Sequence, residues 1–375
     1  MLHHDSRPRS VAIDETAQHF QRELDKKIAA TRHTAEDVIA RVQRDVPSDR
    51  IASTHALRFQ PAGERLTIGA RGSSFEQPLH RHALSQVADR AGIPDAFVTR
   101  LLEKPWGSAL LAENLNTIYG KSDERRLLVR SVHDEVRGVM SDHYRRLDAR
   151  VVVDSFATAC AEVGVVPFEG VAGDLRLCVR AILPVVFRPG DEVIAFGIEI
   201  STSDFAAGAL SVRCFLLRVF CTNLARLQED LRQVHLGRRL DDNVAFSERT
   251  YRLDTRTMAS AVRDVVHGSL AAPKVSSMVA QIEAAMAAKV DFKSALAALP
   301  KSGLLKAEVD AVRDVLVSGG IEQLPPGNSA YRLSNAVSWI AKAAPTAERR
   351  LELEQVAGQL LIGTASRRAA QQEAA

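Results

Sequence analysis

The sequence contains few cysteines, and their positions exclude two common uses of this residue. Among 375 residues there are four cysteines, Cys160, Cys178, Cys214 and Cys221, and no C-x-x-C pair occurs. A zinc knuckle and a disulfide framework both need closely or regularly spaced cysteines, so neither is expected. Free cysteines are typical of a reducing compartment, and the composition therefore favours a location inside the cell.

Long hydrophobic runs are missing as well. No stretch approaches roughly 18 consecutive apolar residues, the length of a membrane-spanning helix, because arginines interrupt even the densest segment, 179–219. The first ten residues lack the apolar segment of a secretory signal peptide. We therefore expect a soluble protein that makes no contact with a membrane.

The chain also lacks a surplus of charge of one sign. It has 49 Lys and Arg against 46 Asp and Glu, which gives a formal net charge of +3. This balance permits a nucleic-acid partner without indicating one. Aromatic residues make up only 5% of the chain, so few side chains are available to stack on bases. Any binding surface must therefore come from where the charges lie.

The motifs of several enzyme classes do not occur. G-x-S-x-G, H-E-x-x-H and G-x-G-x-x-G are all missing, which removes the usual indications of a serine hydrolase, a zinc protease and a dinucleotide-binding fold. The tripeptide Gly120-Lys121-Ser122 resembles the end of a phosphate-binding loop, but Leu115 stands where that loop needs glycine. We predict no cofactor and no metal site, and a non-catalytic role is favoured without being decided.

What the chain does contain is a change of hydrophobic period along its length. Apolar residues recur every three to four positions in 11–45, 150–162 and 224–233, which predicts helices there. Short segments rich in β-branched residues, bounded by glycine and proline, predict strands at a spacing that favours antiparallel pairing. These strands span 126–132, 136–140, 175–182, 193–200 and 211–220.

Two compact helices, 83–91 and 94–104, are expected ahead of the strands, with the spacing of a helix-turn-helix. The second helix carries Asp95 and Phe97 where base-reading side chains would stand, so a packed helix pair without a DNA role is the better interpretation. After residue 251 the chain is almost wholly helical. The helices expected there span 254–269, 275–289, 303–317, 328–342 and 345–363.

These elements predict a protein of the α+β class. We expect a central antiparallel sheet of β-β-β-α character, an N-terminal helical region and a helical C-terminal module. The corresponding division is an N-terminal helical arm over 1–50, an α+β core domain over 51–250 and a C-terminal module over 251–375.

Arginine recurs within and after the predicted strands, and this pattern is the strongest functional signal in the sequence. Burying a guanidinium within a strand costs free energy, unless the group pairs with an anion or lies on a sheet face that is open to solvent. Phosphate is a good partner, because the guanidinium fork matches two of its oxygens. Pairing with Asp and Glu on neighbouring strands explains the pattern equally well, and both interpretations stay open.

The first interpretation predicts a groove between the sheet and the helix after it, holding a nucleic-acid backbone. In this groove arginines bind phosphate, a tyrosine stacks on a base, and an asparagine caps the helix. The candidate residues are Arg130, Arg137, Tyr144, Arg145, Arg213, Arg218, Asn223 and Arg226.

The segment 136–148, V-R-G-V-M-S-D-H-Y-R-R-L-D, resembles a family of phage and plasmid proteins of unknown function. That family has a V-R-x-x-x-S-x-x-Y-x-x-L-D segment, a charged turn similar to 191–193 and an acidic strand exit similar to 199–204. Its most specific signature, Arg-Val-x-Cys-x-Asn, corresponds to 218–223 and is followed by a basic helix, here 232–239. Leu224 departs from this pattern, because many members have Thr or Gly after the asparagine.

The resemblance implies a role beside phage or plasmid recombination and replication genes. A sheet followed by a helix is also similar to the core of single-strand annealing recombinases, which is an analogy of fold. The resemblance and the arginines together predict a non-catalytic protein that binds and anneals single-stranded DNA in the bacterial cytoplasm. Expected partners are further copies of the chain, a phage exonuclease and the host single-strand-binding protein.

Two alternatives come from other classes of function. One is a phage accessory protein that binds a host protein, with its arginines merely paired at the surface. The other, less favoured, is a nuclease that depends on a divalent metal, because carboxylates are the ligands that such ions prefer. Its residues would be Asp191, Glu192, Glu199 and Asp204.

Overall fold

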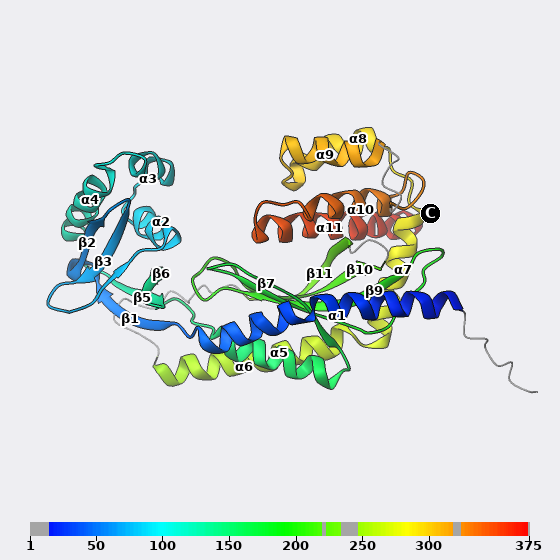
Figure 1. Ribbon diagram of the computed structural model, residues 1–375, viewed down its shortest axis with the longest axis horizontal. Coiled ribbons are helices and arrows are strands. Elements are labelled where there is room, and N and C mark those ends of the chain that lie inside the picture. Colours follow the sequence, from blue (N-terminus) through cyan, green and yellow to red (C-terminus); the bar gives the residue numbers. More distant parts are fainter. Residues whose placement is uncertain (1–14, 220–222, 234–246, 318–323, 374–375) are drawn as a thin grey trace, which may run out of the picture.

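The computed structural model describes residues 15–219, 223–233, 247–317 and 324–373, and the structural statements below concern these residues. Figure 1 shows two groups of elements side by side. We call the group formed by β1 to β6 with α2, α3 and α4 the smaller body, and the remaining elements the larger body.

The larger body is built on a five-stranded antiparallel sheet with the strand order β11-β10-β9-β8-β7. Its strands are β7 (Val166–Ala172), β8 (Leu177–Ile182), β9 (Ile194–Thr202), β10 (Leu210–Arg218) and β11 (Asn223–Gln233). Each strand pairs with the next one in sequence, so short connections build the whole sheet. Every residue of β9 and β10 is buried, which shows that both faces of the sheet are covered at its centre.

Helices cover both edges of this sheet. The helices of the larger body are α1 (Glu15–Arg44), α5 (Ala149–Glu162), α6 (Glu248–Ser269), α7 (Ala272–Ala287), α8 (Phe292–Ala298), α9 (Lys306–Val317), α10 (Ala330–Ala341) and α11 (Ala347–Glu373), with a short 3-10 helix at Leu299–Ser302. Helix α1 lies against edge strand β7, and α11 lies against edge strand β11 (Figure 1). The first three helices, α1, α5 and α6, share one hydrophobic core with the sheet, and α7, α9, α10 and α11 share another.

The smaller body contains two three-stranded sheets and three helices around one core. One sheet has the order β1-β5-β6, with β1 (Ser48–Ser53), β5 (Arg126–Val132) and β6 (Glu135–Ser141). The other has the order β2-β3-β4, with β2 (Leu57–Ala62), β3 (Arg65–Ala70) and β4 (Glu76–Pro78). The helices are α2 (Arg81–Arg90), α3 (Asp95–Leu102) and α4 (Gly107–Lys121), with a 3-10 turn at Thr54–Ala56.

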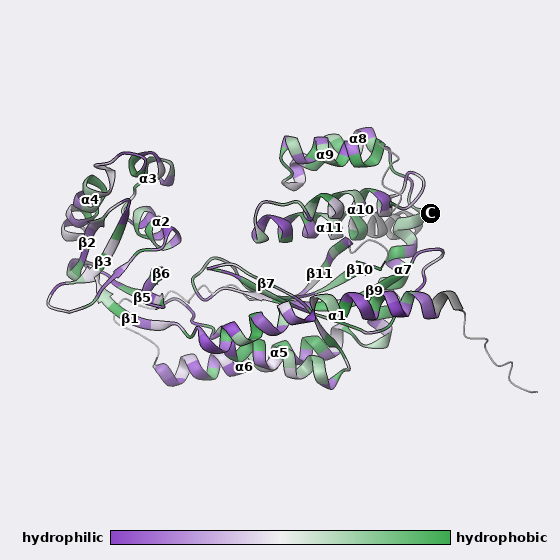
Figure 2. Cartoon of the chain, in the orientation of Figure 1, coloured by the Kyte–Doolittle hydropathy of each residue, from purple (hydrophilic) through white to green (hydrophobic). Residues whose placement is uncertain are grey.

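Polar contacts join the two bodies. The carbonyl oxygen of Phe205, in the loop between β9 and β10, lies 2.9 Å from His82 Nε2 and accepts a hydrogen bond from Gln86 Nε2 at 3.0 Å. Both partners belong to α2 of the smaller body. Figure 2 shows hydrophobic residues along the large sheet, whereas the exposed sides of α1 and the start of α6 are hydrophilic.

The structure confirms the α+β class and most of the predicted elements. All five predicted strands form, the N-terminal helix and α5 form, and the C-terminal part is helical. The helix pair α2–α3 forms too, and its interior contributes Ala88 and Val98 to the core of the smaller body. Strand β7 and helix α8 were outside the prediction. The proposed boundaries at 50 and 250 stay a prediction.

The helix predicted over 224–233 is wrong, because this segment is strand β11. Leu224, Leu227 and Leu231 recur at helical spacing, yet β11 pairs with β10, with Leu217 opposite Leu224. In so short a segment, a ladder with a neighbouring strand outweighs a weak helical periodicity. The last strand is therefore followed by a further strand and not by the helix of a β-β-β-α unit.

Candidate nucleic-acid interface

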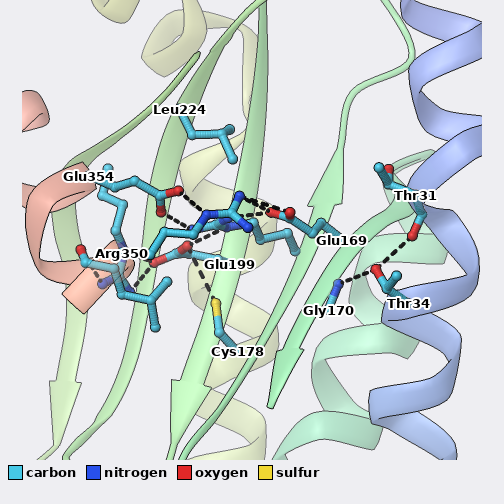
Figure 3. A network of polar contacts seen from close by, with 12 residues as sticks. Thr31, Thr34, Glu169, Gly170, Cys178, Glu199, Leu224, Arg350 and Glu354 are labelled. Atoms are coloured by element: carbon cyan, nitrogen blue, oxygen red, sulfur yellow. Dashed lines mark hydrogen bonds and ion pairs between the residues drawn. The ribbon is translucent and has the colours of Figure 1, made fainter. Parts of the chain in front are cut away.

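Several arginines of the large sheet belong to a buried network of charges (Figure 3). Arg180 on β8 is fully buried and pairs with Glu169 on β7, Glu199 on β9 and Glu354 on α11. Arg350 on α11 completes the network, because its guanidinium donates to Glu169 Oε1 at 2.8 Å and to Glu354 Oε1 at 2.9 Å. These contacts join three strands to the helix that covers the sheet edge.

Arg213 and Arg226, two of the candidate residues, lie in this same network. Arg226 pairs with Glu199, and Arg213 Nε lies 3.7 Å from Glu199 Oε1. Burial raises the pKa of Glu199, but the positive charges of Arg226, Arg180 and Arg213 outweigh burial and lower it to about 2. Glu199 therefore stays ionised, and both candidate arginines are occupied inside the protein.

Arg218 and Asn223 also have partners inside the larger body. Arg218 pairs with Glu192, and its Nη2 donates to Glu192 Oε1 at 2.8 Å. Asn223 Nδ2 donates to the carbonyl oxygen of Asn335 on α10 at 3.2 Å. Since Asn223 begins a strand, the predicted helix cap is wrong. The signature residues 220–222 and the basic segment 234–239 lie outside the described residues.

Arg130 on β5 lies where the two bodies meet and is only 6% exposed. Its Nε donates to Asp49 Oδ1 at 2.8 Å, and its Nη1 donates to the carbonyl oxygen of Asp204 at 3.0 Å. The Asp204 carboxylate lies 3.6 Å from the same Nη1. Burial raises the pKa of Asp204 to about 6, and the Arg130 charge only partly offsets it.

The three remaining candidate residues are also occupied. Tyr144 packs with Leu128 and Met140 and is 7% exposed, so its ring offers no face for stacking on a base. Arg137 Nε donates to Glu135 Oε2 at 3.3 Å. Arg145 forms a two-point ion pair with Asp254 on α6.

The eight candidate residues therefore do not converge on one groove. Each of the six arginines has a carboxylate near it, and the helix that would form one wall of the groove is a strand. The arrangement is the one described by the second interpretation of the arginine pattern, which is pairing with Asp and Glu.

A different basic surface does form, at a cleft of about 300 Å³ where the start of α6 faces the start of α5. Five arginines line it: Arg130, Arg146, Arg150, Arg252 and Arg256. Three carboxylates line it as well: Asp49, Asp148 and Glu248. The cleft therefore has a surplus of positive charge, which suits an anionic ligand.

The arginines at the floor of the cleft are held in place by their neighbours. Arg146 Nη1 lies 3.3 Å from Asp49 Oδ2 and 3.0 Å from Glu248 Oε1. Its guanidinium also covers the ring of Tyr251, with the carbon of the guanidinium 4.4 Å from the ring centroid. At the rim, Arg150 lies 3.6 Å from Asp148.

The surplus charge belongs to Arg252 and Arg256. Both are exposed and stand one turn apart on α6, so their side chains share one face of the helix. Within the described parts of the chain, neither has a carboxylate at ion-pair distance. Arg249, one turn earlier, is also exposed.

The sequence prediction missed this pair because it placed the start of the helix near 254, whereas α6 begins at Glu248. Extending the helix by two turns brings Arg249, Arg252 and Arg256 into one stripe, at spacings of three and four residues. A serine at position 247 is the sequence feature that marks the true start of this helix. Its side chain accepts a hydrogen bond from the backbone N–H of Thr250, as the side chain of a helix N-cap does.

The carboxylates of the nuclease alternative do not form a site. Glu192 is paired with Arg218, Glu199 with Arg180 and Arg226, and Asp204 with Arg130. Among the residues that the structure describes, no three His, Cys, Asp or Glu side chains are grouped so that they could hold a metal ion.

Comparison with known proteins gives no relative: no family model, curated protein or solved structure matches the chain. The resemblance to phage and plasmid proteins therefore stays a prediction. In the described part of the chain, no helix has both the length and the hydrophobicity to cross a membrane.

Proposed function

We propose that the protein binds single-stranded DNA without catalysis, and that it holds the DNA backbone in the cleft between α5 and α6. The position of Arg252 and Arg256 carries the proposal. Among the residues that the structure describes, these two exposed guanidiniums have no carboxylate partner, and three other arginines line the same cleft. Phosphate groups of a polynucleotide are the anions that such a row of guanidiniums fits best.

The arginines at the rim of the cleft and those at its floor have different roles. Arg252, Arg256 and Arg150 at the rim meet the phosphates and release their counterions, which provides the affinity. Arg130 and Arg146 are fixed by carboxylates that balance their charge, and they provide a rigid floor. Binding by phosphate contacts positions the strand and reads no base, so we expect little sequence preference.

The preference for a single strand over a duplex is part of the proposal and rests on the similarity to the core of single-strand annealing recombinases. A cleft of about 300 Å³ is compatible with one backbone and a single nucleotide.

The proposal includes the biological setting that the sequence indicates. We place the protein in the bacterial cytoplasm and in recombination of a phage or mobile element, where a phage exonuclease or the host single-strand-binding protein would be its partner. Three buried free cysteines, Cys160, Cys178 and Cys214, are compatible with a reducing compartment. Self-association is part of the proposal as well, through exposed apolar residues on α3 and α4.

The test is the affinity for a labelled oligothymidylate, measured by fluorescence anisotropy over a series of salt concentrations. The wild-type affinity should fall as salt rises, with a linear slope of log K against log[salt]. Replacing Arg252→Ala and Arg256→Ala together should lower that slope by about 1.4, since each phosphate contact contributes roughly 0.7 for a single strand.

The matched control is Arg90→Ala with Arg100→Ala, which removes two exposed arginines from helices of the smaller body. Its binding curve should stay close to that of the wild type. Equal losses in the two double variants would show that net charge, and not the cleft, governs binding. A wild-type affinity that does not change with salt would exclude the proposal altogether.

A further inference from the structure

A second, smaller cavity, which Asp204 lines, lies at the junction of the two bodies. Its volume is about 60 Å³. Since one water needs roughly 10–15 Å³ on this measure, the cavity has room for a few waters or for one small oxyanion. Three arginines from three separate elements line it: Arg41 on α1, Arg137 on β6 and Arg176 at the turn before β8.

Three carboxylates also line the cavity, but each already lies near an arginine other than Arg176. Asp45 accepts hydrogen bonds from Arg41 Nε at 3.3 Å and Arg44 Nε at 2.9 Å. Asp204 lies beside Arg130 and accepts from the backbone N–H of Ala149 at 3.3 Å.

The third carboxylate, Asp174, is 64% exposed at its side chain and lies 3.7 Å from Arg41 Nη2 and 3.9 Å from His80 Nε2. Burial lowers the pKa of His80, so this ring is neutral near pH 7. None of the three carboxylates is within ion-pair distance of Arg176 in the part of the chain that the structure describes. The Arg176 guanidinium is therefore the uncompensated charge of this cavity.

Two buried polar atoms of the cavity, Arg176 Nε and Thr202 Oγ1, have no hydrogen-bond partner among the described residues. Thr202 is completely buried and ends β9, where it is paired with Leu177, the residue next to Arg176. A buried donor left without a partner costs free energy, so two of them at one cavity indicate a missing acceptor. An oxyanion accepts several hydrogen bonds at once and carries the charge that Arg176 needs.

We propose that this cavity is a binding site for a small phosphate-like oxyanion, held by the Arg176 guanidinium and the Thr202 hydroxyl, with Arg41 and Arg137 at its sides. The site is distinct from the cleft at α6 and does not depend on DNA binding there. Because Arg137 belongs to the smaller body and Arg176 to the larger, a bound oxyanion braces the junction between the two.

The glycine at position 208 provides a way to disturb the site without removing a charge. A Cβ atom placed there would lie 2.7 Å from Arg176 Nε and 3.0 Å from Arg176 Cζ, so the guanidinium has to move. Only the end of a flexible side chain is in the way, and Gly208→Ala should therefore fold normally while shifting Arg176.

The experiment is isothermal titration of the whole chain with inorganic phosphate, at constant ionic strength with chloride. We expect one saturable site in the wild type that binds phosphate more tightly than the open cleft at α6 does. Arg176→Met should weaken binding roughly 10- to 100-fold, because it removes a charge-assisted contact. Gly208→Ala should weaken it as well. Arg90→Ala with Arg100→Ala, which changes two exposed arginines that line neither the cavity nor the cleft, should leave it unchanged.

The melting temperature of Thr202→Val gives a second readout, which is independent of the calorimetric titration. Valine has nearly the shape of threonine without the hydroxyl, so the variant should melt at a higher temperature than the wild type in the absence of phosphate. In the presence of phosphate this advantage should shrink or reverse. Phosphate binding that survives Arg176→Met, or a Thr202→Val variant that is less stable without phosphate, would overturn the site.

Discussion

At the scale of single residues, the main feature is how charge is held inside this protein. Arg180 and Glu199 have fully buried side chains and are stable there only because each faces opposite charges. Asp204 differs, since its side chain is only 12% exposed and lies next to a single arginine, and this burial raises its pKa to about 6. A carboxyl group in that position titrates near neutral pH, which few other carboxyl groups do.

The raised pKa predicts how stability depends on pH. A folded-state pKa near 6, against an ordinary value of 3.8, means that the folded protein prefers the protonated carboxyl. Asp204 therefore lowers the free energy of unfolding as pH rises from about 4 to above 6, by up to about 3 kcal/mol. Asp204→Asn has no such ionisation, so its stability relative to the wild type should increase over this range.

Urea unfolding at several pH values between 4 and 7.5 measures this difference. Asp314→Asn, at an exposed position of α9, controls for the loss of a surface carboxylate. A difference between Asp204→Asn and the wild type that stays constant with pH would show that Asp204 is ionised throughout.

At the scale of elements, the buried network decides how α11 is attached. Glu354 lies on the side of α11 that faces the sheet and pairs with Arg180, whereas Glu352 on the same helix is 57% exposed and pairs with Arg349. Removing one partner of a buried pair leaves the other charge uncompensated, which costs about 3–5 kcal/mol. Removing an exposed partner costs about 0–1 kcal/mol.

Glu354→Gln should therefore destabilise the protein by about 3 kcal/mol, and Glu352→Gln should change little. Hydrogen exchange adds the location of the effect: the amides of α11 should lose more protection than those of the central strand β9 in Glu354→Gln. Equal stabilities of the two variants would mean that the network contributes nothing to docking the helix.

The elements also show what the sequence could predict. Strands such as 193–200 have long apolar runs between turn residues, and their pattern identifies them without knowledge of their neighbours. Segment 224–233 could not be predicted in this way, because its state depends on pairing with β10. The start of α6 was placed too late, and with it the exposed pair Arg252 and Arg256 was missed.

The partners of the arginines were beyond the reach of the sequence for a different reason. Arg180 meets Glu354 across 174 positions of the chain, and Arg145 meets Asp254 across 109. Such pairings depend on the tertiary fold. The composition of a strand therefore cannot distinguish an arginine that is available to bind phosphate from one that is paired with a carboxylate of the protein. The sequence correctly left these two interpretations open.

At the scale of the whole molecule, exposed apolar side chains suggest where copies of the chain meet. Phe97 on α3 is 41% exposed, and Trp106 and Leu110, one turn apart at the start of α4, are 59% and 37% exposed. Large apolar side chains exposed on two helices that contact each other are typical of an interaction surface. Trp106→Gln should therefore weaken the proposed self-association.

Analytical ultracentrifugation over a range of concentrations tests this expectation. Leu305→Gln is the matched control, since Leu305 is a similarly exposed apolar residue (63%) at the other side of the molecule, before α9. The wild type and Leu305→Gln should sediment as larger species, and Trp106→Gln as a smaller one. A wild type that stays monomeric at every concentration would remove self-association from the proposal.

The ion network of Figure 3 has a consequence for how this protein can change over evolutionary time. Arg180, Glu199 and Arg226 are buried among groups of opposite charge. A substitution that removes one of them therefore leaves a buried charge without its partner. We therefore expect tolerated sequence changes to replace two or more residues of the network together, for instance an arginine and a glutamate by two apolar residues. Diverged descendants would keep the entire set or discard it entirely.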